Sequence, residues 1–210
     1  MPNIEFTKFS SRADRSQYVA KRFEKYLTDS VLDVGCYEAP LRAILPKGIY
    51  VGVDMAGNPD ITLNLDRAER LPFADNEFHT VISIETLEHL ENLHRMIGEC
   101  IRVSSNYLIV SLPNCWRDAR QKIERGCGEF AHYGLQITPP LDRHRWFFNF
   151  TQAHGFLTGT AEKYGLEVVE LFGTEQPRNF LVRLLRHLRY NEDNYANRYV
   201  QTIWVVLKKI

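Results

Sequence analysis

The chain has 210 residues, 44% of them hydrophobic and 25% charged, which suits a single globular domain over 1–210 with a full core. Its 26 basic residues balance 26 acidic ones, and this zero net charge argues against a nucleic-acid partner. No stretch approaches the ~20 apolar residues of a membrane span, and the first residues lack the apolar run of a signal peptide. The four cysteines form no CxxC pair, which is typical of reduced thiols. We therefore expect a cytoplasmic protein without membrane contact.

Hydrophobic patterns divide the chain into alternating helices and strands. An amphipathic helix is predicted over 16–27, before the first strand. Seven apolar runs are predicted as strands: 30–35, 49–55, 61–66, 79–85, 106–114, 166–173 and 202–209. Further helices are expected at 40–45, 86–104, 150–165 and 178–190. Thr151 is the expected N-cap of the helix over 150–165, and the stretch 114–150 is less regular.

Strands that are apolar on both faces and alternate with helices indicate an α/β fold, with helices on both faces of a doubly wound, mostly parallel sheet. In such sheets ligands bind beyond the carboxyl ends of the strands. Asp33, Asp54 and Glu85 lie in or just after the first, second and fourth predicted strands. We expect these three carboxylates to meet in one crevice.

The segment VLDVGCYEAP, residues 31–40, runs from the first strand into a loop with one glycine, Gly35. Dinucleotide-binding loops place a pyrophosphate on bare backbone N–H groups. Glu38 would repel a pyrophosphate and Tyr37 would crowd it, so a cationic ligand without phosphate fits better. S-adenosylmethionine is such a ligand, and Asp54, about 20 residues further on, is placed to accept hydrogen bonds from its ribose hydroxyls. A simple turn at Gly35 and a polar strand end at Asp54 are the alternatives.

The segment DRAERLPFADNEFHTVISIETLEHLEN, residues 66–92, makes this assignment more specific. It resembles the D-A-x-x-LPF-x-D-x-x-FD region, followed by LEHL, of class I methyltransferases that use S-adenosylmethionine. VLDVGC and YVGVDM resemble the first two motifs of that family, in the same order, and the resemblance extends over about residues 30–112. It points to small-molecule methyltransferases of type 11/23. The resemblance implies a Rossmann-like, seven-stranded sheet with an antiparallel last strand and a lid insertion after strand five.

The resemblance also implies S-adenosylmethionine as the cofactor, S-adenosylhomocysteine as its product, and roles for the residues around it. Asp33 would orient the methionine ammonium, and Gly35 would let the backbone approach the ligand. Asp54 would bind the ribose, with Met55 against the adenine. Glu85 would line the methyl end of the pocket. The implied cofactor-binding residues are Asp33, Gly35, Cys36, Tyr37, Asp54, Met55, Asp66, Arg67 and Glu85.

On the adenine side, Asp66 would accept from the amino group and Arg67 would lie beside the ring. The chain departs from the family pattern where Tyr37 and Ala39 replace loop glycines and His79 replaces an acid. The altered loop keeps an alternative open, namely a degenerate methyltransferase-like module that binds the cofactor or scaffolds a partner without catalysis. A nicotinamide dehydrogenase is a third alternative, which the single glycine of the loop disfavours.

Three segments are expected near the acceptor site or the domain surface: the N-terminal helical lid 1–29 and the insertions 114–150 and 174–200. The middle segment is dense in aromatic and histidine side chains. A hydroxyl acceptor gains from a general base, for which His144 is the first candidate and His132 the second. The alternative is that the segment RHRWFF covers the sheet edge, with His144 hydrogen-bonded to the backbone.

Four side chains could in principle collect a metal ion: Cys115, Cys127, His132 and His144. Their spacing matches no compact pair of ligands, so we expect no metal site. The amphipathic helix over 178–190 carries four arginines. Such a helix can lie on an anionic membrane, but packing on its own domain is the expected arrangement.

The predicted function is transfer of a methyl group from S-adenosylmethionine to a small-molecule acceptor, such as a hydroxyl of a glycan, a lipid-linked compound or a secondary metabolite. No NPPY-like motif follows the fourth strand, which disfavours a flipped-out base amine as the acceptor. The residues do not distinguish oxygen, nitrogen and carbon methylation, and they carry no signal for the oligomeric state.

Overall fold

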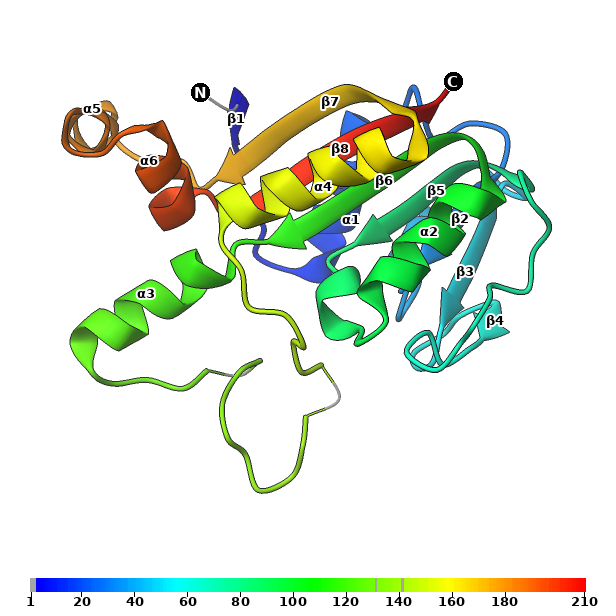
Figure 1. Ribbon diagram of the computed structural model, residues 1–210, viewed down its shortest axis with the longest axis horizontal. Helices are drawn as coiled ribbons and strands as arrows, with labels where there is room; N and C mark the ends of the chain where they lie inside the picture. Colours follow the sequence, from blue (N-terminus) through cyan, green and yellow to red (C-terminus); the bar gives the residue numbers. More distant parts are fainter. Residues whose placement is uncertain (1–2, 131, 141) are drawn as a thin grey trace.

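One eight-stranded sheet organises the protein in the computed structural model, which describes residues 3–130, 132–140 and 142–210 (Figure 1). The strands are β1 (Asn3–Phe6), β2 (Val31–Val34), β3 (Tyr50–Asp54), β4 (Ile61–Thr62), β5 (Phe78–Ile84), β6 (Ser104–Pro113), β7 (Leu166–Glu175) and β8 (Thr202–Lys209). Their order across the sheet is β1-β7-β8-β6-β5-β2-β3-β4. Neighbouring strands pair in parallel, except that β8 runs antiparallel between β6 and β7. The predicted mostly parallel sheet with an antiparallel last strand is thus confirmed.

Helices cover both faces of the sheet (Figure 1). The α-helices are α1 (Arg12–Arg22), α2 (Leu93–Val103), α3 (Cys115–Arg125), α4 (Phe150–Tyr164), α5 (Phe180–Arg189) and α6 (Glu192–Tyr199), and the 3₁₀ helices are η1 (Pro40–Ala43) and η2 (Leu87–His89). One core joins α2 and α4 to the sheet, and a second core joins α1 and η1 to it. Successive residues of β6, such as Leu108 and Ile109, point into different cores. The expected α/β fold with helices on both faces is confirmed.

The edge strand β1 was missed in the sequence. Its residues Ile4 and Glu5 pair in parallel with Gly173 and Thr174 of β7. The strand is four residues long and no residue of it is fully buried. An edge strand of this kind has no apolar run for a pattern to detect. The seven predicted strands are all present, although the weak one over 61–66 shortens to the two residues of β4.

The helix predicted over 86–104 is interrupted. It splits into η2 and α2 because the intervening residues bond to the loop after β4 instead of to one another. The N–H of Glu91 donates to the Asp66 carboxylate at 2.7 Å, and the Asn92 amide donates to the carbonyl of Leu65 at 3.1 Å. The apolar spacing therefore identified a real helical region, but tertiary hydrogen bonds decided where it breaks.

Two helix beginnings also differ from the expectation. The stretch 114–150, expected to be less regular, starts with α3, whose N-cap Asn114 accepts from the N–H of Arg117. For α4 the N-cap is Asn149, because its side chain and that of Gln152 form a reciprocal capping box. Thr151, the predicted cap, already lies inside the helix and bonds to Asn197. The first helix, α1, also lies earlier than predicted, over Arg12–Arg22.

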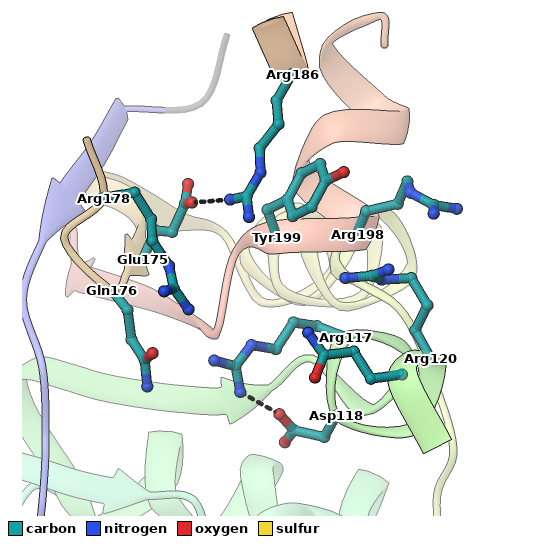
Figure 2. A pocket seen from close by; sticks show the side chains of 10 residues that line it. Arg117, Asp118, Arg120, Glu175, Gln176, Arg178, Arg186, Arg198 and Tyr199 are labelled. Carbon is teal, nitrogen blue, oxygen red and sulfur yellow. Dashed lines mark hydrogen bonds and ion pairs between the residues drawn. The ribbon is translucent and has the colours of Figure 1, made fainter. Parts of the chain in front are cut away.

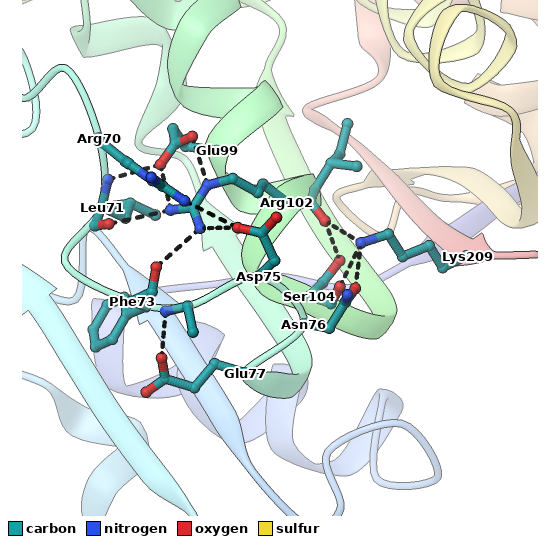
Figure 3. Close-up of polar contacts among 12 residues, drawn as sticks. Arg70, Leu71, Phe73, Asp75, Asn76, Glu77, Glu99, Arg102, Ser104 and Lys209 are labelled. Carbon is teal, nitrogen blue, oxygen red and sulfur yellow. Dashed lines mark hydrogen bonds and ion pairs between the residues drawn. The ribbon is translucent and has the colours of Figure 1, made fainter.

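The LPFADNEF stretch of the motif is fixed by polar contacts near the start of β5 (Figure 3). Arg102, near the end of α2, forms ion pairs of 2.7 Å with Asp75 and with Glu99. Its guanidinium also donates to the carbonyl of Leu71 at 3.1 Å. Lys209 of β8 donates to the carbonyl of the first residue of β6. These bonds fix the loop before β5 in place, so this part of the motif has a structural role.

Helix α5 packs on its own domain, as expected, but through its polar side: the His187 ring stacks on that of Tyr195 at 3.9 Å, and Arg186 pairs with Glu175 at 3.1 Å. None of its residues is buried, and its apolar side chains face solvent on the periphery of the molecule. The exposed apolar residues are Phe180, Leu181, Val182, Leu184, Leu185 and Leu188. Across the described ranges, no helix combines the length and the apolar character that crossing a membrane requires.

Candidate active site

The loop after β2 is built around Gly35, which is the only residue type that fits there. Its φ is +88°, and a Cβ at this position would lie 2.2 Å from the side chain of Thr86. Its N–H donates to the carbonyl of Val53 on β3 at 2.8 Å. A left-handed backbone and a close neighbour both exclude a side chain. The glycine thus lets the first loop pack tightly against the ends of β3 and β5.

Asp54, at the end of β3, joins this loop to the next one. Its Oδ2 accepts from the N–H of Tyr37 at 2.8 Å, and its Oδ1 accepts from the N–H groups of Met55 and Ala56 at 2.6 and 3.2 Å. Two carboxylate oxygens offer about four acceptor positions, so these three bonds leave room for a further donor. The carboxylate is therefore held rigidly at the crevice with capacity for a ligand hydroxyl.

Tyr37 and Ala39 take the left-handed backbone that glycines usually provide, with φ of 47° and 49°. The loop therefore keeps its tight shape despite the substitutions. Gly57 packs directly under Tyr37, because a Cβ there would lie 2.4 Å from the Tyr37 carbonyl group. The Tyr37 ring points outward and the guanidinium of Arg12, at the start of α1, lies 4.7 Å above it. The substitutions place an aromatic surface at the rim of the crevice.

Asp33 is buried at the end of β2, where the Tyr50 hydroxyl donates to its Oδ2 at 2.8 Å. Burial raises the pKa of Asp33 to about 7, and the nearby charge of Asp54 acts in the same direction. Burial also raises the pKa of the Cys36 thiol to about 12, so this thiol is neutral. No cationic side chain in the described part of the chain forms an ion pair with this buried carboxyl, which is therefore suited to receive a positively charged group.

Met55, Asp66 and Arg67, also predicted to bind the cofactor, lie nearer the surface. Met55 is 52% exposed and Arg67 is also exposed. Asp66 accepts from the N–H of Glu91, and the guanidinium of Arg145 lies 3.7 Å from its other oxygen. Asp66 is thereby linked to the segment that precedes α4. The contacts bring Asp33, Gly35, Tyr37 and Asp54 together and leave Met55 and Arg67 at the surface.

Glu85 follows the last residue of β5 with a φ of 49°, an unusual conformation for a glutamate. Its Oε2 lies 2.6 Å from Arg15 of α1, and its Oε1 accepts from the hydroxyl of Thr202 at 2.8 Å. Its N–H donates to the carbonyl of Ser111 on β6. Contacts to Glu85 and Tyr37 therefore place the N-terminal half of α1 over the crevice.

Both predicted catalytic histidines lie in a cluster next to η2. The His144 ring stacks on that of His132 at 4.4 Å and meets that of His89 edge-on at 4.5 Å. The Tyr133 hydroxyl lies 2.6 Å from His144 Nδ1. Burial, together with the two neighbouring histidines, lowers the pKa of His144 to about 3. Burial likewise lowers the pKa of His89.

Glu88 and Tyr133 belong to this cluster and were missed in the sequence. Glu88 is 1% exposed, and its Oε1 lies 3.8 Å from His89 Nε2. Burial raises the pKa of Glu88 well above its ordinary value. The two backbone N–H groups that follow His144 donate to the carbonyl of Glu88, which fastens the insertion to η2. The sequence carried no signal for the burial of Glu88, because a charged residue between two leucines three positions apart is the ordinary pattern of an amphipathic helix.

A second feature lies on the same edge of the sheet, where β6 leads into α3 and β7 ends at Glu175 (Figure 2). It is a cavity of about 220 Å³ with two acidic residues in its wall, Asp118 and Glu175. Five arginines line it: Arg117, Arg120, Arg178, Arg186 and Arg198. Figure 2 shows Arg186 paired to Glu175, at 3.1 Å, and Arg117 paired to Asp118, at 2.5 Å. Arg120 and Arg198 both pair with Glu124, at 2.9 and 3.0 Å, so the five arginines exceed the three carboxylates by two positive charges, which favours an anionic ligand.

Comparison with known proteins agrees with this geometry. A family described as a methyltransferase domain matches residues 32–106, which run from β2 to the start of β6. Among solved structures, a methyltransferase that depends on S-adenosylmethionine from Archaeoglobus fulgidus has a TM-score of 0.62 at 16% identity and covers 95% of both chains. The methyltransferase domain of bacterial CtHen1 has a TM-score of 0.60 at 18% identity, covering 94% of this chain and 97% of its own. No curated protein matches the chain.

Magnesium protoporphyrin IX methyltransferase from Synechocystis PCC 6803, solved with bound S-adenosylhomocysteine, is similar with a TM-score of 0.55 at 15% identity, covering 95% of this chain and 84% of its own. Residues 32–106 thus match a methyltransferase domain, and the chain shares the fold of methyltransferases that depend on S-adenosylmethionine. S-adenosylmethionine is the cofactor that the matched domain and the fold indicate. The residues present fit that ligand, since Asp54 keeps acceptor capacity and Asp33 is a buried carboxyl that forms no ion pair with a described cationic side chain.

Proposed function

We propose that the protein methylates a hydroxyl group of a small-molecule acceptor that carries a phosphate or a carboxylate. The observation that supports an anionic acceptor most directly is the arginine-lined cavity. It opens at the carboxyl ends of β6 and β7, on the edge where β2, β3 and β5 also end. Cofactor and acceptor would then bind side by side at one edge of the sheet.

On the cofactor side, Asp54 would accept hydrogen bonds from the ribose and Asp33 would face the methionine ammonium. Met55 and Tyr37, both exposed at the rim, would cover the adenosine. Glu85 would line the end of the pocket nearest the methyl group. Bound S-adenosylmethionine supplies a methyl group on a positively charged sulfur, which a nucleophile displaces in line. The protein's task is to align the acceptor oxygen with that methyl group and to exclude water.

On the acceptor side, we assign the general base to His132 ahead of His144. His132 Nδ1 lies 3.1 Å from the carbonyl oxygen of Asp142 and 3.5 Å from its carboxylate, which orients the ring and leaves Nε2 to accept a proton. The lowered pKa of His144 makes it a weak proton acceptor at neutral pH. His144 would instead position the groups around it.

The N-terminal segment and the two insertions would enclose this site. Helix α1 contacts the crevice through Arg12 above Tyr37 and through the ion pair of Arg15 with Glu85. An incoming cofactor would compete with these contacts, so α1 would act as the lid. The stretch 114–150 supplies the histidines, and α5 and α6 supply the far wall of the arginine-lined cavity.

The proposal is tested with pairs of hydroxyl compounds that differ only in a phosphate or carboxylate group. Transfer of a labelled methyl group should occur with the anionic member and be at least about tenfold slower with the neutral one, given the value of charge-assisted hydrogen bonds. Arg117→Gln and Arg178→Gln should each raise KM for the anionic acceptor and leave the affinity for S-adenosylhomocysteine unchanged. Arg125→Gln, an exposed position on the same helix α3, is the matched control. Equal rates on both members, or transfer only to an oligonucleotide, would exclude this acceptor class.

A further inference from the structure

The cluster at η2 contains a carboxylate in an unusual situation. Glu88 is 1% exposed, and its Oε2 makes no hydrogen bond with any residue that the structure describes. Its neighbour Glu85 is also acidic and is already neutralised by Arg15. A buried carboxylate oxygen without a partner carries a large desolvation penalty unless a cation or a proton compensates it. Among the described residues, the Glu88 carboxylate therefore has no group that compensates the burial of its Oε2.

Two imidazoles complete the arrangement. Glu88, His89 and His144 each offer one ligand atom, and these three atoms lie within 4.8 Å of one another. Ligand atoms at about 2.1 Å from one ion lie about 3–4 Å apart, so small side-chain rotations would bring all three to a common centre. We propose that Glu88, His89 and His144 bind one divalent transition-metal ion at the acceptor side of the crevice.

The outer contacts of the two histidines match those of metal-bound imidazoles. His89 Nδ1 lies 3.3 Å from the carbonyl of Arg143, and His144 Nδ1 lies 2.6 Å from the hydroxyl of Tyr133. Each ring thus keeps Nε2 for an ion. Metal-binding histidines commonly use the second nitrogen in this way, which fixes the tautomer and the ring orientation.

The charges of the cluster also suit a cation. Two neutral nitrogens and one carboxylate leave a net negative site that a divalent ion would balance. A set of two imidazoles and one carboxylate favours zinc, iron, cobalt or manganese over magnesium or calcium. Three protein ligands leave at least one coordination position open.

An ion at this place would bind the acceptor hydroxyl and make it more acidic. The hydroxyl proton would pass to His132, the oxygen would form a bond to the methyl carbon, and the electron pair of the carbon–sulfur bond would stay on the sulfur as a neutral thioether. This use of the ion rests on the proposed function, whereas the metal site itself does not. No metal site was expected because the spacing of Cys115, Cys127, His132 and His144 matches no compact pair of ligands. Glu88 and His89, which are far from His144 along the chain, were not among those candidates.

The test measures binding without cofactor or acceptor. The full chain, stripped of metal by a chelator and dialysed, is titrated with Co²⁺, followed by absorbance, and with Zn²⁺, followed by calorimetry. We expect one equivalent of each ion. Glu88→Gln, which keeps the shape of the side chain but removes the carboxylate, and His144→Gln should each weaken binding by about 10–100-fold or more. His154→Gln on α4, outside the cluster, should bind like the parent protein.

Circular dichroism and thermal unfolding show whether each variant is folded, and His144→Gln decides the matter if Glu88→Gln does not fold. No binding to the parent protein, or equal affinity in the Glu88 and His144 variants, would overturn the metal site. If the parent protein binds the metal but the metal-free protein still transfers methyl groups at the full rate, the metal site stands and only the role of the ion in the reaction is excluded. The acceptor-pair assay remains a separate test, so its failure is distinguishable from failure of the metal site.

Discussion

Binding of the cofactor's ammonium group should release a proton from Asp33. This carboxyl is buried at the end of β2 and its pKa is raised to about 7 by burial, so it is largely protonated below neutral pH. An ammonium group placed beside it would favour the carboxylate and lower that pKa. The affinity for S-adenosylhomocysteine should therefore rise with pH, because at low pH the ligand must first displace the proton.

The size of the effect follows from the pKa. Between about pH 5 and 6.5 the dissociation constant should fall about tenfold per pH unit, and it should level off above about pH 7. Asp33→Asn cannot ionise and should bind with a flat pH profile. Tyr50→Phe removes the hydroxyl that donates to Asp33 at 2.8 Å. This loss should raise the pH at which the dissociation constant levels off.

The same carboxyl affects the stability of the ligand-free protein. Its pKa is raised in the folded state, so its contribution is fully present below about pH 4 and is lost as pH rises through about 7. A difference of about 3 in pKa corresponds to an upper limit of about 4 kcal/mol in the free energy of unfolding. Calorimetry at several pH values measures the dissociation constant of S-adenosylhomocysteine, and urea unfolding at the same pH values measures the free energy of unfolding. A flat profile in the parent protein, or an unchanged slope in Asp33→Asn, would refute the assignment of Asp33.

Three further substitutions test other parts of the structure. Gly35→Ala should lower the free energy of unfolding by about 2–4 kcal/mol, because it combines a positive φ with a Cβ 2.2 Å from Thr86, and urea unfolding equal to the parent would contradict this. Asp54→Ala should weaken S-adenosylhomocysteine binding by about 10–100-fold through lost ribose hydrogen bonds, as measured by calorimetry. An unchanged dissociation constant in a folded variant would remove Asp54 from the site. Arg102→Met should cost about 2–4 kcal/mol, since it breaks a partly buried network, whereas Arg70→Met at an exposed pair should cost less than about 1. Equal effects of the two arginine variants would show that the network in Figure 3 contributes little.

The sheet was predictable because its strands bury both faces, and such runs stand out in any sequence. The runs that became β5, β6 and β8 are continuous and apolar, and all three lie in the middle of the sheet. The edge was not predictable, because β1 is short and exposed. The predicted helix boundaries were wrong where tertiary hydrogen bonds overrode local preference. An example is the N–H of Glu91, which donates to the Asp66 carboxylate instead of to a helical carbonyl.

The candidate site was predictable only in its inner part. Asp33, Gly35 and Asp54 stand at strand ends, and strand ends of a parallel sheet meet at one edge. The cluster of Glu88 with His144 needed the insertion to fold back on η2, and hydrophobic periodicity does not say which loops meet. The arginine-lined cavity likewise collects side chains from α3, α5, α6 and the end of β7, whose proximity depends on the packing of irregular segments.

A crystal structure of the protein with S-adenosylhomocysteine tests the cofactor crevice most directly. We expect both ribose hydroxyls within hydrogen-bond distance of the Asp54 carboxylate, the ammonium next to Asp33 and the sulfur toward Glu85 and the histidine cluster. A nucleoside bound elsewhere, or a ribose turned away from Asp54 in a crevice of unchanged shape, would contradict this placement and, with it, the position of the acceptor.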